Sequence, residues 1–398
     1  MGIFHGSHTC PAPKNAAEIN TVAQPIVGSV TFQHLILYIC AGCTGVASIL
    51  CLVNIFIHLA HYSRPKEQRQ IVRVVFTPVI FCLFSIFTQI GYSSAIYMPP
   101  IRDLYESFAL AAIFLLFVEY VAPDPSTRSA YFSNLENRQP RGGRFSNSNK
   151  DYDIVPGGSL RFFKTRWIIL FLFLVVEIII TITQEASQAT GTYCLTSMKP
   201  YFAHVWVLVI GHGATAVAVI AILRFYGRLK AVPEFASHRP LLKLISLKLI
   251  VFTNFIQTFV FSILQGQGVL TGNHKVTAND LQYGIPSLLT AVENVIFAAF
   301  MLYSFRASEY KGDGKAMSFP AAAAHALNPL DYIQGIFTAF RYLLGVAATH
   351  QGGHNHNNVL RNGLQQAYSS GEDTVMNPNM QNYNVKYGSQ GDAEAMRY

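Results

Sequence analysis

The stretch from Tyr97 to Tyr120, YMPPIRDLYESFALAAIFLLFVEY, joins three charged residues to an apolar run long enough to cross a lipid bilayer. A crossing helix needs about 20 mostly apolar residues, and six other stretches of the chain also qualify. The sequence therefore predicts an all-α membrane protein with seven transmembrane helices. The predicted helices cover residues 34–60, 74–98, 104–122, 166–186, 201–223, 241–265 and 281–305.

The composition of the chain agrees with a membrane protein. Its 398 residues are 51% hydrophobic and 13% charged, and the mean hydropathy is +0.30, a balance that soluble proteins of this size rarely have. The net charge of +8 does not indicate nucleic-acid binding, because Lys and Arg lie in short stretches between apolar runs. The first 33 residues lack a basic start followed by an apolar core, so we expect the first helix to act as its own insertion signal.

The basic residues predict the orientation in the membrane. Lys and Arg gather in the connections after the first, third and fifth predicted helices, which all lie on one side. Such an excess marks the cytoplasmic side, so we expect a cytoplasmic C-terminus and a lumenal or extracellular segment 1–33. The other side has only Lys14, Arg102, Lys199 and Lys275.

Two polar regions lie on the expected cytoplasmic side. The connection 123–165 is rich in Gly, Ser, Asn and Arg and is predicted to be disordered. The tail 306–398 is predicted to be disordered apart from an amphipathic helix over 329–346, which would lie on the membrane, dock in a partner's groove or pack against the protein itself. Its apolar stripe consists of Leu330, Ile333, Phe337, Phe340 and Leu344.

The cysteines are too few and too scattered for a disulfide scaffold. Cys40 and Cys43 form a C-x-x-C inside the first predicted helix, where small packing residues are a better interpretation than redox or metal chemistry. Cys10 and Cys194 alone lie in polar segments, and the sequence leaves open whether they pair.

Polar residues inside predicted membrane helices are expensive and are usually paired or functional. Lys248 and Glu293 lie at depths at which they can pair, although Lys248 can also reach the interface alone. Together with neighbouring polar residues they form either a solute or proton path or hydrogen-bonded glue between helices. The candidate path residues are Glu177, His204, His212, Lys248, Asn254, Gln257, Glu293 and Asn294, and Glu119, Asn54 and His58 are further polar residues in predicted helices.

No chemical motif indicates an enzyme, a metal site or a cofactor. His204 and His212 are eight residues apart, which is two helical turns and too far for direct chelation. Glycine loops for phosphate, nucleophile elbows and zinc-protease motifs are all missing from the sequence. The sequence therefore predicts no catalytic residues.

Several linked motifs identify a family. HLAHYSRPKEQRQIVRVVFTPVI on the first cytoplasmic connection, RDLYESF, LKLIVFTNFIQ and LNPLDYIQGIF resemble segments of the organic solute transporter alpha and transmembrane protein 184 family, over roughly residues 34–340. The residues that match are His58, His61, Tyr62, Pro65, Gln68, Arg69, Ile71, Arg73, Pro78, Arg102, Asp103, Tyr105, Glu106, Phe108, Lys248, Phe252, Gln257, Glu293, Asn328, Pro329 and Asp331.

The resemblance implies seven helices with an outside N-terminus. The alpha branch exports bile acids and steroid conjugates with a small single-helix subunit, and it has a cysteine cluster after the third helix that this chain lacks. The transmembrane protein 184 branch, with fungal-type members in vacuolar and other endomembranes, is therefore the better match. Some fungal relatives recruit an autophagy ubiquitin-like modifier through a tail helix, for which Asp331, Tyr332 and Ile336 are the candidates here.

Two other seven-helix classes fit poorly. A retinal protein needs a lysine in the seventh helix for its Schiff base, and 281–305 has none. Common G-protein-coupled receptors have Asp-Arg-Tyr after the third helix and Asn-Pro-x-x-Tyr in the seventh, where this chain has VEYVAPD and AAFMLYSF.

The sequence thus predicts a transporter-like protein for an amphipathic organic anion or lipid-like solute, in a vacuolar or other endomembrane or in the plasma membrane. The alternative is a membrane adaptor whose tail helix recruits an autophagy or trafficking factor. A second copy or a single-helix subunit is a further possible partner.

The charges that precede the third predicted helix have two interpretations. Arg102 and Glu106 are one turn apart and can pair, and Asp103 and Glu106 can stabilise the helix start. Alternatively, Arg102, Asp103 and Glu106 form the outer mouth of a solute path.

Overall fold

In the computed structural model, the described residues are 10, 23–136, 138–140, 152–154, 158–194, 197, 199–266, 272–311 and 316–345. Seven helical spans of this part are long and apolar enough to cross a membrane, as predicted, and the chain is an integral membrane protein. The spans are Phe32–Ala60, Pro65–Ile90, Tyr92–Val121, Leu160–Ala189, Ala203–Leu229, Pro240–Phe261 and Asp280–Tyr310.

The elements follow one another along the chain with two short strands between the third and fourth spans. Residues 330–345 form a last helix. The chain divides into two compact units, Met1–Tyr342 and Leu343–Tyr398. The elements are α1 (Phe32–Ala60), α2 (Pro65–Val75), α3 (Thr77–Ile90), η1 (Tyr92–Tyr97), α4 (Met98–Val121), α5 (Arg128–Asn134), β1 (Arg138–Pro140), β2 (Tyr152–Ile154), α6 (Leu160–Ala189), α7 (Ala203–Leu229), α8 (Pro233–Ser237), α9 (Pro240–Gly266), η2 (Asp280–Gly284), α10 (Ile285–Ser304), η3 (Ala307–Tyr310) and α11 (Phe319–Leu327). β1 and β2 pair antiparallel, with Gln139 opposite Asp153.

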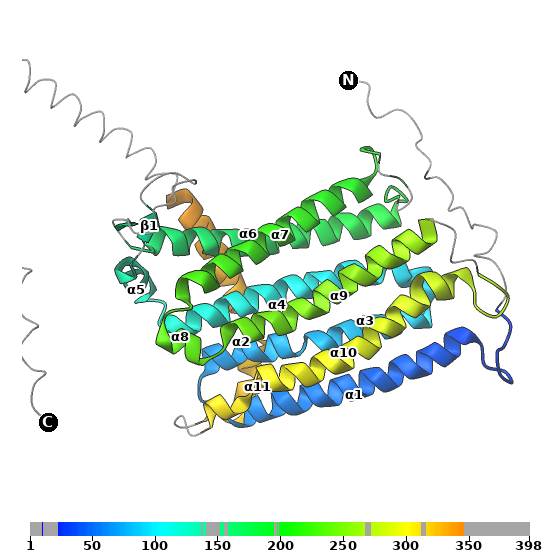
Figure 1. Cartoon of the computed structure of the whole chain (residues 1–398), viewed down its shortest axis with the longest axis horizontal. Helices are drawn as coiled ribbons and strands as arrows, with labels where there is room; N and C mark the ends of the chain where they lie inside the picture. Colours follow the sequence, from blue (N-terminus) through cyan, green and yellow to red (C-terminus); the bar gives the residue numbers. More distant parts are fainter. Residues whose placement is uncertain are drawn as a thin grey trace, which may run out of the picture. The chain divides into compact units, whose positions relative to one another are not determined.

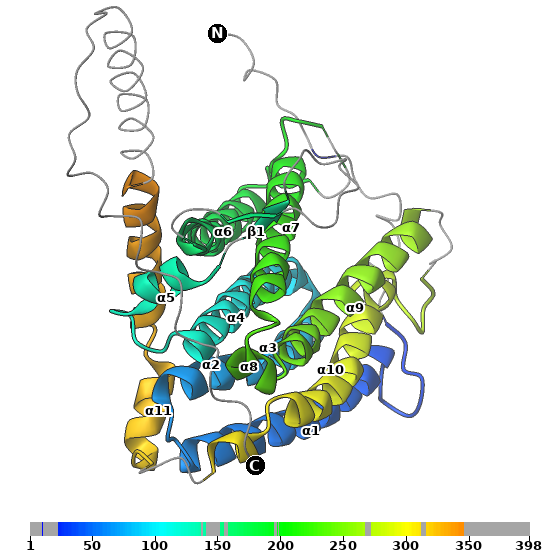
Figure 2. The same ribbon diagram turned by 60° about the vertical axis from the view of Figure 1, so that its left-hand side comes forward.

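Helix α4, which contains the apolar run of the opening stretch, is the central element of the bundle. Every residue from Ala109 to Val118 is buried, because α2, α3, α6, α8 and α9 all contact this helix (Figure 1). Helix α1 packs beside α10, as Figure 2 shows for the blue and yellow ribbons. The outer helices expose large apolar side chains such as Phe56 and Val217, as expected for surfaces that face lipid.

The second span differs from its predicted bounds. The sequence predicts a helix over 74–98, but the span is Pro65–Ile90 and is interrupted at Phe76 between α2 and α3. Helix α2 contains six polar or charged residues, which hydropathy assigns to a connection. In the structure, Glu67, Gln68 and Gln70 are buried because partners on other helices bind them, so this polar segment belongs to the bundle.

The connection 123–165 is more ordered than predicted. Helix α5 lies within it, and α6 begins at Leu160. Phe132 of α5 is fully buried and stacks on Phe163, with 4.1 Å between the ring centroids. Gly158 has φ +57°, and a side chain there would collide with the carbonyl oxygen of Ser133. Only glycine therefore fits this turn before α6. The prediction of disorder is therefore wrong at both ends, and its centre lies outside the described residues.

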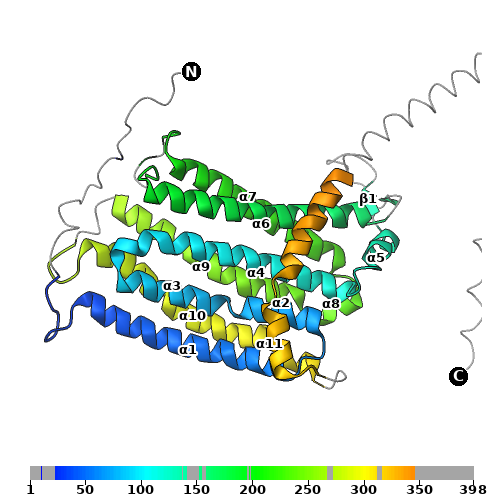
Figure 3. The same ribbon diagram turned by 180° about the vertical axis from the view of Figure 1, so that it is seen from behind.

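The tail is also more ordered than predicted. The amphipathic helix is present over 330–345, and α11 precedes it as an unpredicted element. Figure 3 shows this last helix, in orange, crossing α2, α4 and α6. Nε1 of Trp167 donates to the carbonyl oxygen of Gly335, and a Cβ on Gly335 would overlap Phe171, so the close approach to α6 requires glycine. Residues 346–398 lie outside the described residues.

A disulfide joins Cys10 to Cys194. Cys194 follows α6 and lies in the connection to α7, at the opposite end of the bundle from α5, α8 and α11. Disulfides persist in oxidising compartments, so the pairing that the sequence left open agrees with a lumenal or extracellular position for this end.

Candidate functional site

An ion pair joins α4 to α9 within the membrane-spanning part. Nζ of Lys248 lies 2.9 Å from Oε1 of Glu106 and donates to it. The two side chains are only 19% and 13% exposed. Lys248 is eight residues inside α9, about 12 Å along the helix axis, where an unpaired charge would be costly. Glu106 therefore neutralises a lysine that could not remain alone at this depth.

Two pairings predicted from the sequence are wrong. Among the described residues, neither Lys248 with Glu293 nor Arg102 with Glu106 forms an ion pair. Lys248 faces α4 rather than α10, and so it takes Glu106. Arg102 pairs with the adjacent Asp103, with 3.0 Å between Nε and Oδ1, and its guanidinium lies over the ring of Phe81.

Glu177 of α6 brings another carboxyl to the same place. Its side chain is buried, and Oε1 accepts a long hydrogen bond of 3.5 Å from the hydroxyl of Thr215 on α7. The charges of Glu106, Asp103 and Lys248 all act on Glu177. Two contacts, Lys248 with Glu106 between α9 and α4 and Glu177 with Thr215 between α6 and α7, therefore lie within electrostatic reach of each other. We call Glu106, Glu177, Thr215 and Lys248 the central cluster.

The two histidines of the predicted path lie in different surroundings. His212 is exposed on α7 and meets the ring of Phe255 on α9 edge-on, with centroids 6.3 Å apart. His204 lies at the disulfide end, beside the backbone of Cys194 and the ring of Tyr193. His212 can therefore contribute to a path between α7 and α9, whereas His204 belongs to the end of the bundle.

The remaining predicted path residues form a separate group between α9 and α10. Oγ1 of Thr290 donates to Oδ1 of Asn254 at 3.0 Å, and Nδ2 of Asn294 donates to the carbonyl oxygen of Thr290 at 2.7 Å. Glu293 is beside Gln257. The contact of Thr290 with Asn254 is hydrogen-bonded glue between α9 and α10, whereas that of Asn294 lies within α10. The predicted path therefore separates into the central cluster and this amide group.

The family motif after α1 fixes a corner of the fold. Nε2 of Gln68 donates to the carbonyl oxygens of His58 and His61 at 3.0 and 2.8 Å, and the imidazole of His58 bonds to the carbonyl oxygen of Phe305. The hydroxyl of Tyr62 donates to the carbonyl oxygen of Pro65, the first residue of α2. The motif therefore binds α1, α2 and α10 together and, since α2 begins at Pro65, most of it is helix rather than connection.

Two arginines of the same motif hold the last helix. Asp331 accepts hydrogen bonds from Nη1 and Nη2 of Arg73 at 2.8 and 2.9 Å and from Nε2 of Gln70 at 2.6 Å, and Arg69 lies 3.3 Å away. Burial opposes the charge of Asp331, but the bonds and charge of Arg73, helped by Gln70 and Arg69, hold the pKa of Asp331 below its ordinary value. We call Arg69, Gln70, Arg73 and Asp331 the tail clamp.

The predicted partner motif of the tail is occupied within the protein. Tyr332 is buried, its ring lies under the guanidinium of Arg73, and its hydroxyl donates to the carbonyl oxygen of Phe108. Ile336 packs against the core. Of the alternatives weighed for this helix, packing against the protein itself is what Asp331, Tyr332 and Ile336 show. The predicted apolar stripe, from Leu330 to Phe340, remains exposed.

Sequence reasoning missed a buried lysine near the start of α9. Lys243 is 1% exposed, and its Nζ donates to the hydroxyl of Tyr120 at 2.8 Å and to Glu309 at 3.1 Å. His238 stacks on Tyr120 and also contacts Glu309. A lysine that follows a basic connection is taken as a topology signal, so only the apolar residues on both sides of it could have marked it as buried.

The described residues contain no group of three or more His, Cys, Asp or Glu side chains that could hold a metal ion. Glu119, another polar residue of a predicted helix, pairs with Arg128 at the start of α5. It therefore closes the end of α4 and lies apart from the central cluster.

Comparison with known proteins gives one family. Residues 36–310 match the family model described as organic solute transporter Ostalpha. No solved structure matches the chain.

Curated relatives come from distant eukaryotes. The vacuole membrane protein hfl11 of Schizosaccharomyces pombe is 25% identical over 284 residues, which cover 69% of this chain and 62% of hfl11. The protein LAZ1 homolog 1 of Arabidopsis thaliana is 23% identical over 67% of this chain and 56% of its own length. A transmembrane protein 184 homolog of Dictyostelium discoideum is 22% identical over 66% of this chain and 50% of its own. The matched part of the chain thus spans half to three fifths of these relatives.

Proposed function

Because the chain belongs to the organic solute transporter Ostalpha family, as its motifs predicted, we propose that it moves an amphipathic organic anion or lipid-like solute across an endomembrane. The observation that supports this best is the central cluster. Glu106, Glu177 and Lys248 all lie inside membrane spans, and intramembrane ionisable residues usually mark a substrate or ion pathway.

The chemistry of the central cluster suits a solute with one charged end. Lys248 is a cation that an anionic group can engage if it displaces Glu106. The carboxyl of Glu177 is within electrostatic reach of Lys248, Glu106 and Asp103. The exposed ring of Phe255 beside His212 offers an apolar wall. A few polar anchors within apolar walls are the usual form of a site for such ligands.

The proposed orientation puts the basic connections in the cytoplasm and the Cys10–Cys194 disulfide in the lumen or outside. The name of the Schizosaccharomyces pombe relative, a vacuole membrane protein, supports a vacuolar or related membrane. The outer mouth formed by Arg102 and Asp103 then lies on the disulfide side of the central cluster, and Glu106 belongs to the cluster itself.

Flux through the purified protein tests this proposal. The wild-type chain is reconstituted into phosphatidylcholine vesicles that are loaded with a radiolabelled sulfated steroid. The efflux of steroid is compared with that from vesicles that contain Lys248→Met or the control Lys199→Met. Lys199 is exposed and contacts Tyr201 outside the cluster. We expect Lys248→Met to lose most of the flux and the control to keep it; equal flux in all three proteins would refute a role for the central cluster.

A second candidate function, an adaptor for an autophagy ubiquitin-like modifier or trafficking factor, is favoured by one observation. Leu330, Ile333 and Phe337 are exposed on a helix otherwise packed against the protein, which is a surface that a partner's groove could cover. Because Tyr332 and Ile336 are already occupied, we propose that this exposed stripe, and not the predicted motif, would bind the partner.

The adaptor role is tested by Phe337→Asp, which alters the exposed stripe and leaves the tail clamp intact. Loss of co-purification of the modifier, with unchanged steroid flux, would support the adaptor. Unchanged co-purification in Phe337→Asp would refute binding through this stripe.

A further inference from the structure

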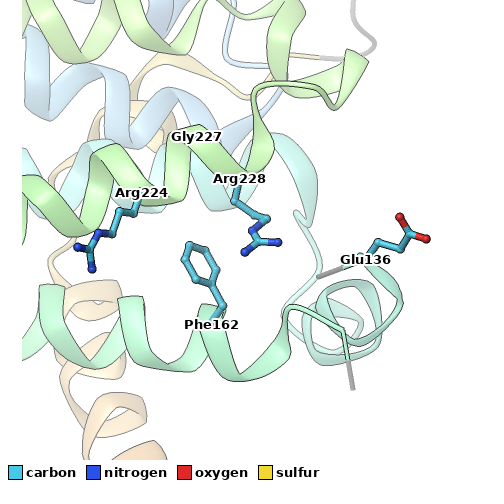
Figure 4. A pocket seen from close by; sticks show the side chains of 5 residues that line it. All are labelled: Glu136, Phe162, Arg224, Gly227 and Arg228. Carbon is cyan, nitrogen blue, oxygen red and sulfur yellow. The ribbon is translucent and has the colours of Figure 1, made fainter. Parts of the chain in front are cut away.

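A cavity of about 550 Å³ lies between the ends of α6 and α7 at the basic end of the bundle, away from the central cluster. Phe162 of α6 and Arg224, Gly227 and Arg228 of α7 line it, together with Glu136 (Figure 4). A side chain on Gly227 would meet no atom within 4 Å, so α7 borders open space here.

Arginines converge on this cavity. The guanidinium of Arg228 lies over the ring of Phe162, 5.1 Å from its centroid, and that of Arg166 lies over the same ring at 5.0 Å. Arg224 is close enough to Arg166 for their like charges to repel. Figure 4 shows Arg224 and Arg228 on the two sides of Phe162. The ring thus organises two of the three guanidinium groups, which are well suited to bind phosphate oxygens in pairs.

These arginines lack an acidic partner among the described residues. None of Arg166, Arg224 and Arg228 forms an ion pair there, and Nε of Arg166 is buried without a hydrogen-bond acceptor. The carboxylate of Glu136 belongs to the lining but points away from the arginines in Figure 4. Elsewhere in the described part, buried cations such as Lys243, Lys248 and Arg73 each have a carboxylate. Within the described residues, the arginines at this cavity therefore differ from these cations, and an added anion could bind them.

An apolar surface leads from the cavity into the membrane region. Val217, Ile220 and Arg224 follow one another at helical spacing along one face of α7, and the first two are 52% and 48% exposed. Leu223 beside them is 45% exposed. A molecule with a phosphate at the arginines could lay an acyl chain along this face, which a free phosphate could not use.

We propose that the cavity between α6 and α7 binds the phosphorylated headgroup of an anionic phospholipid. Arg224 and Arg228, which line the cavity, would contact the phosphate, Arg166 would add positive charge beside them, and the face of α7 would contact an acyl chain. Basic pockets between membrane helices on the cytoplasmic side are suited to such headgroups. The site is separate from the central cluster, so the proposed lipid binding does not depend on the proposed transport.

Binding to the purified full chain in detergent tests the site. The probes are dioctanoyl phosphatidylinositol monophosphate, dioctanoyl phosphatidylcholine and the soluble inositol bisphosphate that is the headgroup of the first. We expect the first lipid to bind at least about tenfold more tightly than either comparator. The double variant Arg224→Gln/Arg228→Gln should weaken its binding by about tenfold or more, since charged hydrogen bonds are lost.

The control variant is Arg306→Gln/Arg341→Gln, which removes the same charge from exposed positions outside the cavity. Its affinity for the lipid should stay within about twofold of wild type. Equal binding by the cavity variant and the control would overturn the proposal, and equal binding of the soluble headgroup would overturn the acyl-chain contact and leave a site for soluble anions.

A photoactivatable phosphatidylinositol monophosphate gives a second measurement that needs no variant. Crosslinks to the wild-type protein should fall in peptides that contain residues 160–168 or 217–230. Crosslinks confined to other parts of the bundle would overturn the proposal even if the arginine variants failed to fold.

Discussion

Replacing Asp331 with Asn should release the last helix from the bundle. Asp331 is the only carboxylate among the described residues that contacts Arg69 and Arg73, and it accepts two of the hydrogen bonds of Arg73. The side chains of Asp331 and Arg73 are 11% and 12% exposed. Asparagine keeps the size of the side chain but leaves two buried guanidinium groups without a countercharge.

The magnitude follows from the contacts that remain. Breaking one partner of a buried pair costs about 3–5 kcal/mol. Arg73 would keep its bond to the carbonyl oxygen of Asn328 and its contact with the Tyr332 ring, 4.4 Å from the centroid. We therefore expect the lower end, about 3 kcal/mol, which is about a hundredfold in the population of the undocked helix.

Hydrogen exchange of the full-length protein in detergent measures this population. Amides of residues 331–342 should exchange about a hundredfold faster in Asp331→Asn than in wild type if their exchange reports undocking. The matched control is Asp103→Asn, because Asp103 also pairs with an arginine but is 54% exposed, so its loss should cost at most about 1 kcal/mol. Unchanged exchange in Asp331→Asn, or equal acceleration in the control, would refute the tail clamp.

Three further predictions concern other contacts. Lys248→Glu combined with Glu106→Lys should restore the stability lost in Lys248→Glu alone, measured as thermal unfolding in detergent, and a double variant no more stable than the single one would contradict the pair. Cys194→Ser should lower the free energy of unfolding by about 2–5 kcal/mol. Thiol labelling of unfolded, unreduced wild type should leave Cys10 and Cys194 unlabelled, and a label on either cysteine would contradict the disulfide. Burial and nearby Arg69 lower the pKa of His325. The contribution of His325 to the docking of α11 should therefore be full above about pH 6.5 and decline as the pH falls through the folded-state pKa. Exchange of α11 amides should accelerate in mild acid, and His325→Gln should remove that pH dependence.

The seven spans could be predicted from sequence because each is a long apolar run, which is a local property. The predicted bounds of the second span were wrong because that span contains polar residues. Helix α2 has Arg69 and Arg73 in its length, and only the presence of Asp331, more than 250 residues away, makes their burial possible. Hydropathy contains no information about such a partner.

The sequence indicates which polar residues to consider for the candidate site, but it does not indicate which of them pair. The cost of charge in a membrane singles out Lys248, Glu177 and Glu293 as candidate functional residues. Which carboxyl meets Lys248 depends on how α9 is rotated against α4 and α10, and depth along a helix does not fix that rotation. The sequence offers Glu106 as part of a helix start or of an outer mouth, whereas in the structure it pairs with Lys248.

The tail helix shows the same limit. Its periodicity predicted an amphipathic helix, and the helix is present over 330–345. The sequence could not decide which side faces the protein, since Tyr332 and Ile336 pack inward while the more regular apolar stripe stays exposed. Gly335 was the available signal, because a glycine inside a helix indicates a close approach of another element.

The most direct test of the central cluster as a solute path is the efflux of sulfated steroid from vesicles that contain Glu177→Gln. This change removes the carboxyl group without changing the size of the side chain. The hydrogen bond of Glu177 with Thr215 is a long one, so its loss should cost little stability. We expect efflux to fall at least about tenfold while the thermal unfolding temperature stays near that of wild type. Wild-type efflux from a correctly folded Glu177→Gln protein would contradict it.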